Sequence, residues 1–160
     1  MRHTISCLVR NRPGVLARVA TAFADHRINI HSLAVNESEG ENVSRLTIVI
    51  EGEKNELDDM AKDAAKLEDV VAVEDLDRSG FLDRELVIVK IGAKPQDLPR
   101  LMQIIEVMHA DVVAMGPETM TIEMTGTEEK ISSFVRLLKP FGIWEYARSG
   151  RVAVSTGETR

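Results

Sequence analysis

Two spacings of apolar residues alternate along the chain, and the order in which they occur repeats once. Apolar residues at every second position predict strands, whereas apolar residues three or four positions apart predict helices. In the first half, strands are predicted at 3–10, 28–37, 44–52 and 69–76, and apolar helix stripes at 15–23 and 57–67. Pro13 suits the first position of the first helix, where no N–H is needed, and the polar run at 36–42 predicts a turn.

The same order of elements returns after a polar segment at 77–83, which we interpret as a linker. Strands are predicted at 85–91, 111–115, 119–125 and 143–147, and helix stripes at 98–108 and 131–138. Each half is therefore a βαββαβ unit of the ferredoxin-like kind, with helices over one face of an antiparallel sheet. The predicted fold class is α+β, with two tandem ferredoxin-like domains at 1–77 and 84–160.

The other face of each sheet is expected to carry apolar side chains. The positions that we expect there are Leu8, Val49, Val87 and Val89. A monomer would expose them to water, so we expect a homodimer or docking of one half upon another.

Composition narrows the classes of partner. The 160 residues are 44% apolar, enough for a real core, and carry a net charge of −6 with 4% aromatic residues. This excess of acidic residues argues against nucleic acid or an anionic membrane as a partner, because both require concentrated Lys and Arg. The single cysteine, Cys7, lies in an alternating apolar run and is expected to be a buried small hydrophobe. No signal peptide or membrane span is evident, so we expect a cytoplasmic protein.

Motifs for catalysis or metal binding are missing from the sequence. The histidines do not have metal-ligand spacing, and the sequence has no CxxC, HExxH, GxSxG, P-loop or GxGxxG motif. We therefore predict no catalytic residues, no metal site and no cofactor on this chain. Near the C-terminus, Tyr146, Arg148 and Arg151 are either anchors for an acidic partner or part of a terminal strand whose arginines face solvent.

The two halves differ at the start of their first helices. Pro13 and Leu16 align with Pro95 and Leu98, so the framework repeats. The polar and backbone-exposing residues of the first half do not repeat: where it has Asn11, Gly14 and Asn29, the second half has Ala93, Gln96 and Asp111. This asymmetry indicates that a site lies in the first half alone.

The residues around Gly14 suit the binding of a small carboxylate. A helix N-terminus offers unpaired N–H groups and the positive end of the helix dipole, and Gly14 exposes the backbone at a cost of roughly 1 kcal/mol relative to Ala. Asn11 and Asn29, expected within a few ångströms of each other, could bind the ammonium and carboxylate groups of an amino acid. Val15, Leu16, Ile28 and Ile30 could line a pocket for an aliphatic side chain.

A purely structural interpretation of the same residues remains open. Asn11 could simply cap the helix, Gly14 could serve the turn, and Asn29 could begin a strand beside solvent. A phosphate-binding loop, as in acylphosphatase-type enzymes, is another alternative, with Arg12 as the arginine it would need. A stand-alone amino-acid sensor that regulates transcription would need a DNA-binding domain, for which two βαββαβ units leave no room.

The stretch "NRPGVLARVATAFADHRINIHSLAV" resembles the opening of an ACT domain, a small-molecule-sensing ferredoxin-like module of amino-acid metabolism. Together with "SRLTIVI", "DRELVIVKI" and "EYARSGRVAV", it resembles the small regulatory subunit of acetolactate synthase, also called acetohydroxyacid synthase. The resemblance extends from Arg2 to about Gly157. One departure is Met108 and His109, where many relatives have a Phe-Arg pair.

The resemblance implies a regulatory subunit without catalytic residues, acting in branched-chain amino acid biosynthesis. It implies that the chain binds and activates a catalytic subunit, a transferase that carries thiamine diphosphate, FAD and magnesium. It also implies feedback inhibition by valine or a related amino acid, bound between the ACT domains of a homodimer, whereas the C-terminal domain contacts the catalytic subunit. The effector-binding positions of the family fall on Asn11, Gly14, Val15, Leu16, Asn29 and Ile30.

Overall fold

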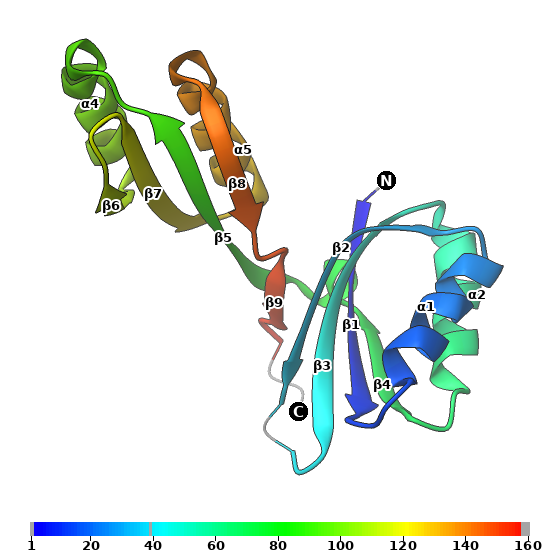
Figure 1. Ribbon diagram of the computed structural model, residues 1–160. Helices are drawn as coiled ribbons and strands as arrows, with labels where there is room; N and C mark the ends of the chain where they lie inside the picture. The colour runs from blue at the N-terminus through cyan, green and yellow to red at the C-terminus, as the bar shows by residue number, and fades with distance from the viewer. Residues whose placement is uncertain (1, 39, 158–160) are drawn as a thin grey trace. The chain divides into compact units, whose positions relative to one another are not determined.

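The protein consists of two compact units, each built around an antiparallel sheet (Figure 1). The computed structural model describes residues 2–38 and 40–157 of the chain. The first unit is formed by Met1–Leu82 together with Arg151–Arg160, and the second by Asp83–Gly150. The predicted α+β class with tandem ferredoxin-like units is confirmed.

The first unit has the order predicted for a βαββαβ domain, with additions at its end. Its sheet has the order β2-β3-β1-β4, and its pairs are antiparallel. The elements are β1 (Arg2–Arg10), α1 (Val15–Asp25), β2 (Asn29–Glu37), β3 (Val43–Glu51), α2 (Lys54–Ala65), β4 (Val70–Asp75), α3 (Leu76–Ser79) and β9 (Val152–Ser155). The turn expected at 36–42 joins β2 to β3, and its residue 39 lies outside the described residues.

The second unit repeats this topology with the sheet order β6-β7-β5-β8. Its elements are β5 (Phe81–Gly92), η1 (Pro95–Asp97), α4 (Leu98–Met108), β6 (Asp111–Met115), β7 (Thr119–Gly126), α5 (Glu128–Leu138), η2 (Lys139–Phe141) and β8 (Ile143–Arg148). The side chain of Thr127 accepts a hydrogen bond from the Lys130 N–H and so caps α5.

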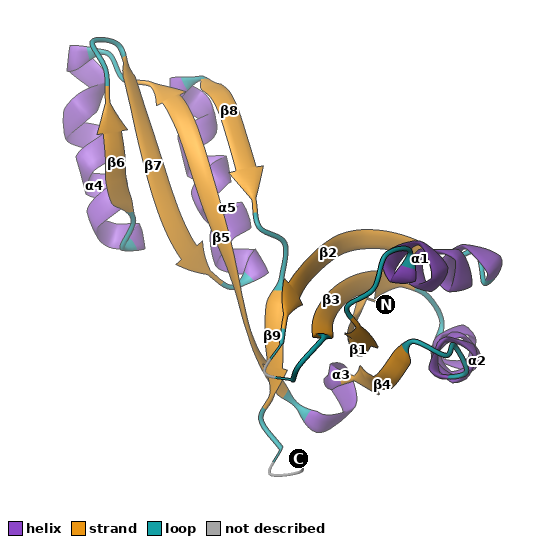
Figure 2. Ribbon diagram, turned by 60° about the horizontal axis from the view of Figure 1, so that its bottom comes forward, coloured by secondary structure: helices purple, strands orange, loops and turns teal. Residues whose placement is uncertain are grey.

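Each unit has one hydrophobic core, which lies between its sheet and its two long helices (Figure 2). In the first core, Phe23 of α1 and Met60 of α2 are fully buried against Ile5 and Ile48 of the sheet. In the second core, Val87 and Val89 pack with Leu101 and Phe134. The expectation that Val87 and Val89 face away from the helices was therefore wrong. Leu86 and Ile88, which alternate with them along β5, lie on the outward face, and Ile88 is 40% exposed.

The segment interpreted as a linker is instead ordered. The Asp75 side chain accepts a hydrogen bond from the Asp77 N–H at 3.2 Å, which caps the short helix α3. Gly80 then adopts a positive φ of 76°, and β5 begins at Phe81. The polar segment therefore forms a capped helical turn followed by the start of β5.

The C-terminal strand β9 belongs to the first unit, although its sequence was assigned to the domain at 84–160, of which 158–160 lie outside the described residues. The Arg151 N–H donates to Ser32 Oγ at 3.2 Å, and Arg151 Nη1 donates to Thr4 Oγ1 at 2.7 Å. The Arg151 guanidinium also lies 6.0 Å from the centre of the Phe81 ring. Arg151 therefore fastens β9 to the first unit, and the interpretation of solvent-facing arginines was wrong for it.

We predict that Arg151→Ala loosens β9. A hydrogen bond to a charged group contributes about 1.5–3 kcal/mol, so its loss should speed amide exchange in Val152–Ser155 by about tenfold or more. Hydrogen–deuterium exchange of the whole protein measures this, and exchange in β8 should not change. Arg151→Lys, which keeps a cationic donor, should have a smaller effect, and exchange in β9 that is equally slow in all three proteins would contradict the assignment.

Cys7 is fully buried in the first core, as expected, and burial raises the pKa of its thiol to about 12. The charged thiolate is disfavoured away from water, so the thiol stays protonated well above neutral pH. We predict that a thiol reagent at pH 8 does not label the folded protein and labels the unfolded protein fully. Because Cys7 is the only cysteine, the same sample in denaturant is the control.

Candidate functional site

The β1–α1 loop is built around a left-handed glycine. Gly14 has φ 83° and ψ −6° and is the N-cap of α1, which begins at Val15. A Cβ atom on Gly14 would lie 3.3 Å from Arg18 Nη1. The prediction that Pro13 is the first helical residue was therefore wrong, because the chain turns at Pro13 and Gly14 before the helix starts. Gly14 does serve the turn, since a left-handed backbone favours glycine.

The first turn of α1 has no side-chain cap among the described residues, and no acidic residue lies in it. The Val15 N–H donates to the Arg12 carbonyl at 3.3 Å, and the Arg18 N–H makes a helical bond to the Gly14 carbonyl at 3.1 Å. Between them, the amides of Leu16 and Ala17 stand at the positive end of the helix dipole. A carboxylate ligand can accept hydrogen bonds from these amides, because no described side chain does so.

Asn11 lies beside this helix end but does not cap it. Its Nδ2 donates to Glu37 Oε1 at 3.2 Å, and its backbone N–H donates to the Asn42 carbonyl at 2.6 Å. The alternative in which Asn11 merely caps the helix is therefore wrong. A cavity of about 430 Å³ adjoins Asn11, and Arg10, Arg12 and Val43 contribute to its lining.

Two arginines lie beside a buried aspartate at this loop. Asp69, only 7% exposed, forms an ion pair with Arg18 and lies 3.6 Å from Arg12 Nη1. The Arg10 N–H donates to the Asp69 carbonyl at 2.8 Å, so the residue before β4 is fixed to the end of β1. Glu37 beside Asn11 and Glu41 in the cavity lining add negative charge, and Arg10 adds positive charge, so the arginines and carboxylates around the loop are equal in number. Arg12, which a phosphate-binding loop would need, is held beside Asp69.

The remaining predicted residues do not all offer side chains to one surface. Val15 is 3% exposed and belongs to the core, so it can contribute only its backbone to a ligand. Ile28 is also buried in the core. Leu16 is 44% exposed, and Ile30 is half-buried against the core. Leu16 and Ile30 are therefore the side chains available to contact an aliphatic group.

Asn29 lies at the opposite end of the sheet from Asn11 within one chain. Asn29 pairs with Glu51 of β3, whereas Arg10, which precedes Asn11, pairs with Val43. Eight steps along a strand at about 3.4 Å each separate the two ends by roughly 27 Å. The expectation that Asn11 and Asn29 lie within a few ångströms in the same chain was therefore wrong. Both β1 and β2 are antiparallel to β3, so β2 runs parallel to β1 and starts at the far end.

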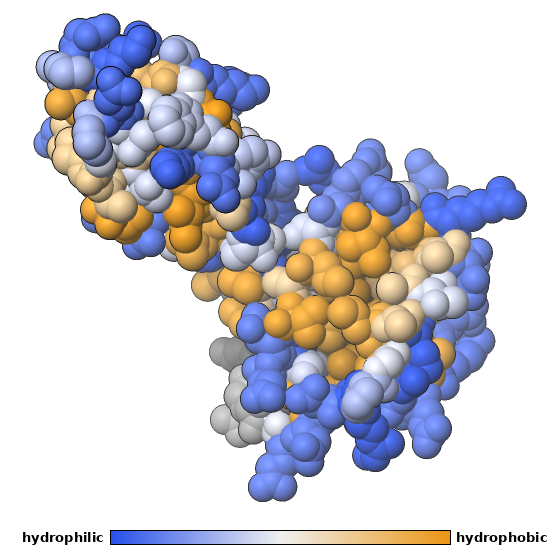
Figure 3. Space-filling view, viewed as in Figure 1, coloured by the Kyte–Doolittle hydropathy of each residue, from blue (hydrophilic) through white to orange (hydrophobic). Residues whose placement is uncertain are grey.

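The outer edge of β2 is open among the described residues, because β2 pairs only with β3. Figure 3 shows a continuous apolar area on the first unit, in the region where Figure 1 draws β2, β3 and α1. Val35 of β2 is 41% exposed and Leu16 of α1 is 44% exposed. An unpaired strand edge beside apolar side chains is a surface that proteins usually cover with a partner.

The second unit does not repeat the loop. Its first helix, α4, follows the 3-10 turn η1, and its N-cap is Asp97 in a right-handed conformation. Gln96, which aligns with Gly14, lies inside that turn. His109 ends α4 with a left-handed φ of 56°. Among the described residues, a left-handed glycine directly before the first long helix occurs in the first unit and not in the second.

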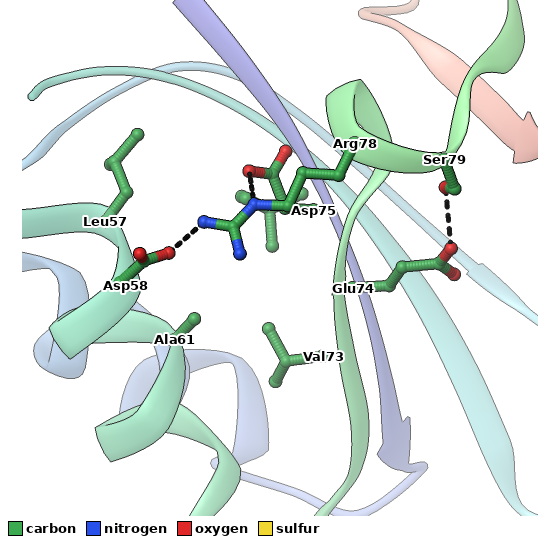
Figure 4. Close-up of a pocket in the computed structure, with 9 residues that line it drawn as sticks. Leu57, Asp58, Ala61, Val73, Glu74, Asp75, Arg78 and Ser79 are labelled. Carbon is green, nitrogen blue, oxygen red and sulfur yellow. Dashed lines mark hydrogen bonds and ion pairs between the residues drawn. The ribbon is translucent and has the colours of Figure 1, made fainter. Parts of the chain in front are cut away.

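A cavity of about 370 Å³ lies between α2 and β4, and sequence reasoning missed it. Arg78 is one of the side chains that line it (Figure 4). Arg78 forms ion pairs with Asp58 and Asp75, and the hydrogen bond to Asp58 raises the pKa of Arg78. Nearby, the side chains of His3, Asp75 and Asp77 each offer one possible metal-ligand atom, and these atoms lie within 4.8 Å of one another. Asp77 already accepts a hydrogen bond from the Thr4 N–H at 2.6 Å, and Arg78 would repel a cation. We therefore interpret this cluster as stabilising the fold rather than binding a metal.

Comparisons with known proteins establish the class and then the family. Residues 5–72 match the family described as "AHAS small subunit-like ACT domain", so the unit that contains the loop is an ACT domain. Residues 84–157 match the family "Small subunit of acetolactate synthase". The chain belongs to the family of acetolactate synthase small subunits, as the resemblance implied.

Full-length relatives agree with this assignment. The chain is 39% identical over 155 residues to the acetolactate synthase small subunit of Mycolicibacterium smegmatis, covering 97% of this chain and 91% of that protein. It is 39% identical over 156 residues to that of Aquifex aeolicus, covering 96% and 80%. The crystal structure of the acetolactate synthase small subunit from Thermotoga maritima is similar with a TM-score of 0.91 at 33% identity, covering 99% of each chain. None of the described helices is long and apolar enough to cross a membrane.

Proposed function

We propose that this chain senses valine, or a related branched-chain amino acid, and passes that signal to the catalytic subunit of acetolactate synthase. In its free form it activates the catalytic subunit, which carries the thiamine diphosphate, FAD and magnesium. With effector bound, it activates that subunit less. The observation that carries the proposal is the uncapped first turn of α1, beside Asn11 and two arginines, in an ACT domain.

The carboxylate of the effector binds the amides at the start of α1. A carboxylate at a helix N-terminus accepts N–H donors and gains from the dipole, which contributes about 0.3–1 kcal/mol at exposed sites. Gly14 keeps the approach open because it has no side chain, and Asn11 offers an amide group at the rim. Arg12 and Arg18, which lie beside Asp69 near this helix end, attract an anionic group.

The ammonium group of the effector needs a hydrogen-bond acceptor near the start of α1. Asn29 of the same chain does not supply it, because Asn29 lies at the far end of the sheet. We infer that two ACT domains pair through their open β2 edges in antiparallel fashion, about a twofold axis near the middle of β2, at Leu33. Such pairing sets the partner's Asn29 opposite Glu37, whose carboxylate lies 3.2 Å from Asn11 Nδ2. Asn11, Gly14 and the partner's Asn29 then meet at one site.

The same pairing encloses the aliphatic part of the ligand. Leu16 and Val35 are exposed at this surface, and Ile30 is half-buried. Their burial by a second copy removes apolar area from water and leaves an apolar pocket beside the polar groups. Such a pocket discriminates weakly among branched-chain amino acids, since one methylene contributes roughly 1–3 kcal/mol.

Regulation follows by linkage between effector binding and association with the catalytic subunit. Because the site lies between two chains, the effector stabilises one arrangement of the ACT pair over others. The catalytic subunit, which contacts the C-terminal domain, is activated less by that arrangement. A coupling of about 1–3 kcal/mol suffices for a marked change in activity.

We predict that Gly14→Asp abolishes effector binding, because its carboxylate occupies the place of the carboxylate of the ligand. The variant subunit should still activate the catalytic subunit. Calorimetry with valine measures the first effect, and an acetolactate assay of the reconstituted holoenzyme measures the second.

Gly14→Asn is the matched control. Asparagine has the shape of aspartate without its charge and tolerates a left-handed backbone better than most residues. It should bind valine more tightly than Gly14→Asp does. If the holoenzyme with Gly14→Asp were as sensitive to valine as the wild type, the carboxylate would not bind at this helix end.

Mixing two variants tests whether each site spans two chains. Asn11→Ala and Asn29→Ala should each lose valine binding as homodimers. After unfolding and refolding together, their heterodimers contain one intact site, so about a quarter of all sites should recover. Calorimetric stoichiometry measures the recovery.

A second mixture also distinguishes a site that spans two chains from a site that lies within one chain. Wild type refolded with an equal amount of the Asn11→Ala/Asn29→Ala double variant leaves about a quarter of the sites intact if each site spans two chains, and about half if each site lies within one chain. Recovery of half the sites here, with none in the first mixture, would refute the pairing through β2.

A further inference from the structure

A groove of about 560 Å³ runs along the second unit between α5 and the edge strand β8. Its walls come from Val135, Arg136 and Lys139 on one side and from Ile143, Tyr146 and Arg148 on the other. Three side chains in the lining are cationic and none is acidic, in a chain whose net charge is −6. The groove therefore concentrates positive charge on a protein that is otherwise acidic.

Two of these cations have no carboxylate partner among the described residues. Arg148 forms an ion pair with Glu85, which is only 5% exposed, so its charge is balanced within the unit. The Arg136 guanidinium donates only to the hydroxyl of Ser133, at 3.2 Å, and the Lys139 ammonium group has neither a hydrogen bond nor an ion pair in the described structure. Two solvent-facing positive charges next to a balanced third favour an acidic group from outside the chain.

The edge strand of the groove can also pair with the backbone of another chain. Within the described residues, β8 pairs only with β5, so its other edge has free N–H and C=O groups over Ile143–Arg148. Tyr146, 55% exposed, lies in the groove, and Trp144 is 63% exposed with Lys90 Nζ 5.8 Å from its ring centre. Exposed aromatic residues beside an unpaired edge are typical of a surface that binds an extended segment.

We propose that this groove is the docking surface for an extended acidic segment of the catalytic subunit, an inference that rests on the proposed function. The segment would add a strand to β8 with its carboxylates against Arg136 and Lys139. A strand that covers the six residues of β8 is roughly 20 Å long. The family assignment supplies the partner, because a small subunit acts on a large one, and the unbalanced charges supply the chemistry of the contact.

The test is association of the catalytic subunit with the double variant Arg136→Glu/Lys139→Glu. Both side chains are exposed, so we expect the variant to fold and to bind valine as the wild type does. Its affinity for the catalytic subunit, measured by titration of activation and by calorimetry, should fall by at least about tenfold. Wild-type affinity should weaken as salt is raised, and the variant should lose most of this dependence.

Lys94→Glu is the matched control, an exposed charge reversal on the same unit outside the groove lining, and it should associate like the wild type. Lys139→Gln, a milder change, should weaken association in the same direction as the double variant. If wild type associates but the double variant binds equally well, the groove is not the docking surface, and the proposed function stands. If the groove binds sulfate while association is unchanged, it is a site for small anions instead. If wild type does not associate at all, both the inference and the proposed function fail.

Discussion

The amide groups at the start of α1, which no described side chain caps, are the feature on which the proposed function depends. The left-handed conformation of Gly14 ends the loop so that α1 starts at Val15 with its first N–H groups facing outward. An aspartate or serine N-cap would satisfy those donors from within the chain and leave nothing for a ligand. The nearby arginines are held by Asp69, so they add positive charge without filling the place of the ligand.

Sheet register is the second constraint, and it forces the proposed site to span two chains. Because β1 and β2 are parallel, Asn11 and Asn29 lie at opposite ends of the sheet. Antiparallel pairing of two β2 edges would place the start of one β2 beside the end of the other. Asn11 of one chain and Asn29 of the other would then lie close together across the twofold axis. In the proposed dimer, ligand binding and pairing of the ACT domains are linked, so a bound ligand can change the arrangement that the catalytic subunit meets.

Local patterns in the sequence predicted most of this structure. Alternating and helical spacing located the main strands and the long helices, because the side chains of one face must be buried together. The left-handed glycine and the mismatch with Gln96 located the loop, since both are local properties of the chain. The helix start at Val15 was placed two residues early because Pro13 fits a first helical turn and a preceding turn equally well.

The errors came from features that depend on residues far apart in sequence. The position of Asn29 depends on which end of the sheet β2 enters, and α1 decides this by carrying the chain back along the sheet. The outward face of β5 was misassigned because apolar residues occupy both faces of that strand, so alternation alone does not choose between Val87 and Ile88. The attachment of β9 depends on contacts between Arg151 and Thr4, which lie at opposite ends of the chain.

The most direct test of carboxylate binding at α1 changes the ligand and leaves the protein intact. Calorimetry of the native small subunit should compare valine with valinamide, which keeps the side chain and the ammonium group but replaces the carboxylate by a neutral amide. Saturable binding of valine with an affinity at least about tenfold above that of valinamide is the predicted result, because a charged acceptor binds N–H donors more strongly than a neutral one does. Equal affinities for the two ligands, or no binding of valine by the wild-type protein, would contradict the central claim.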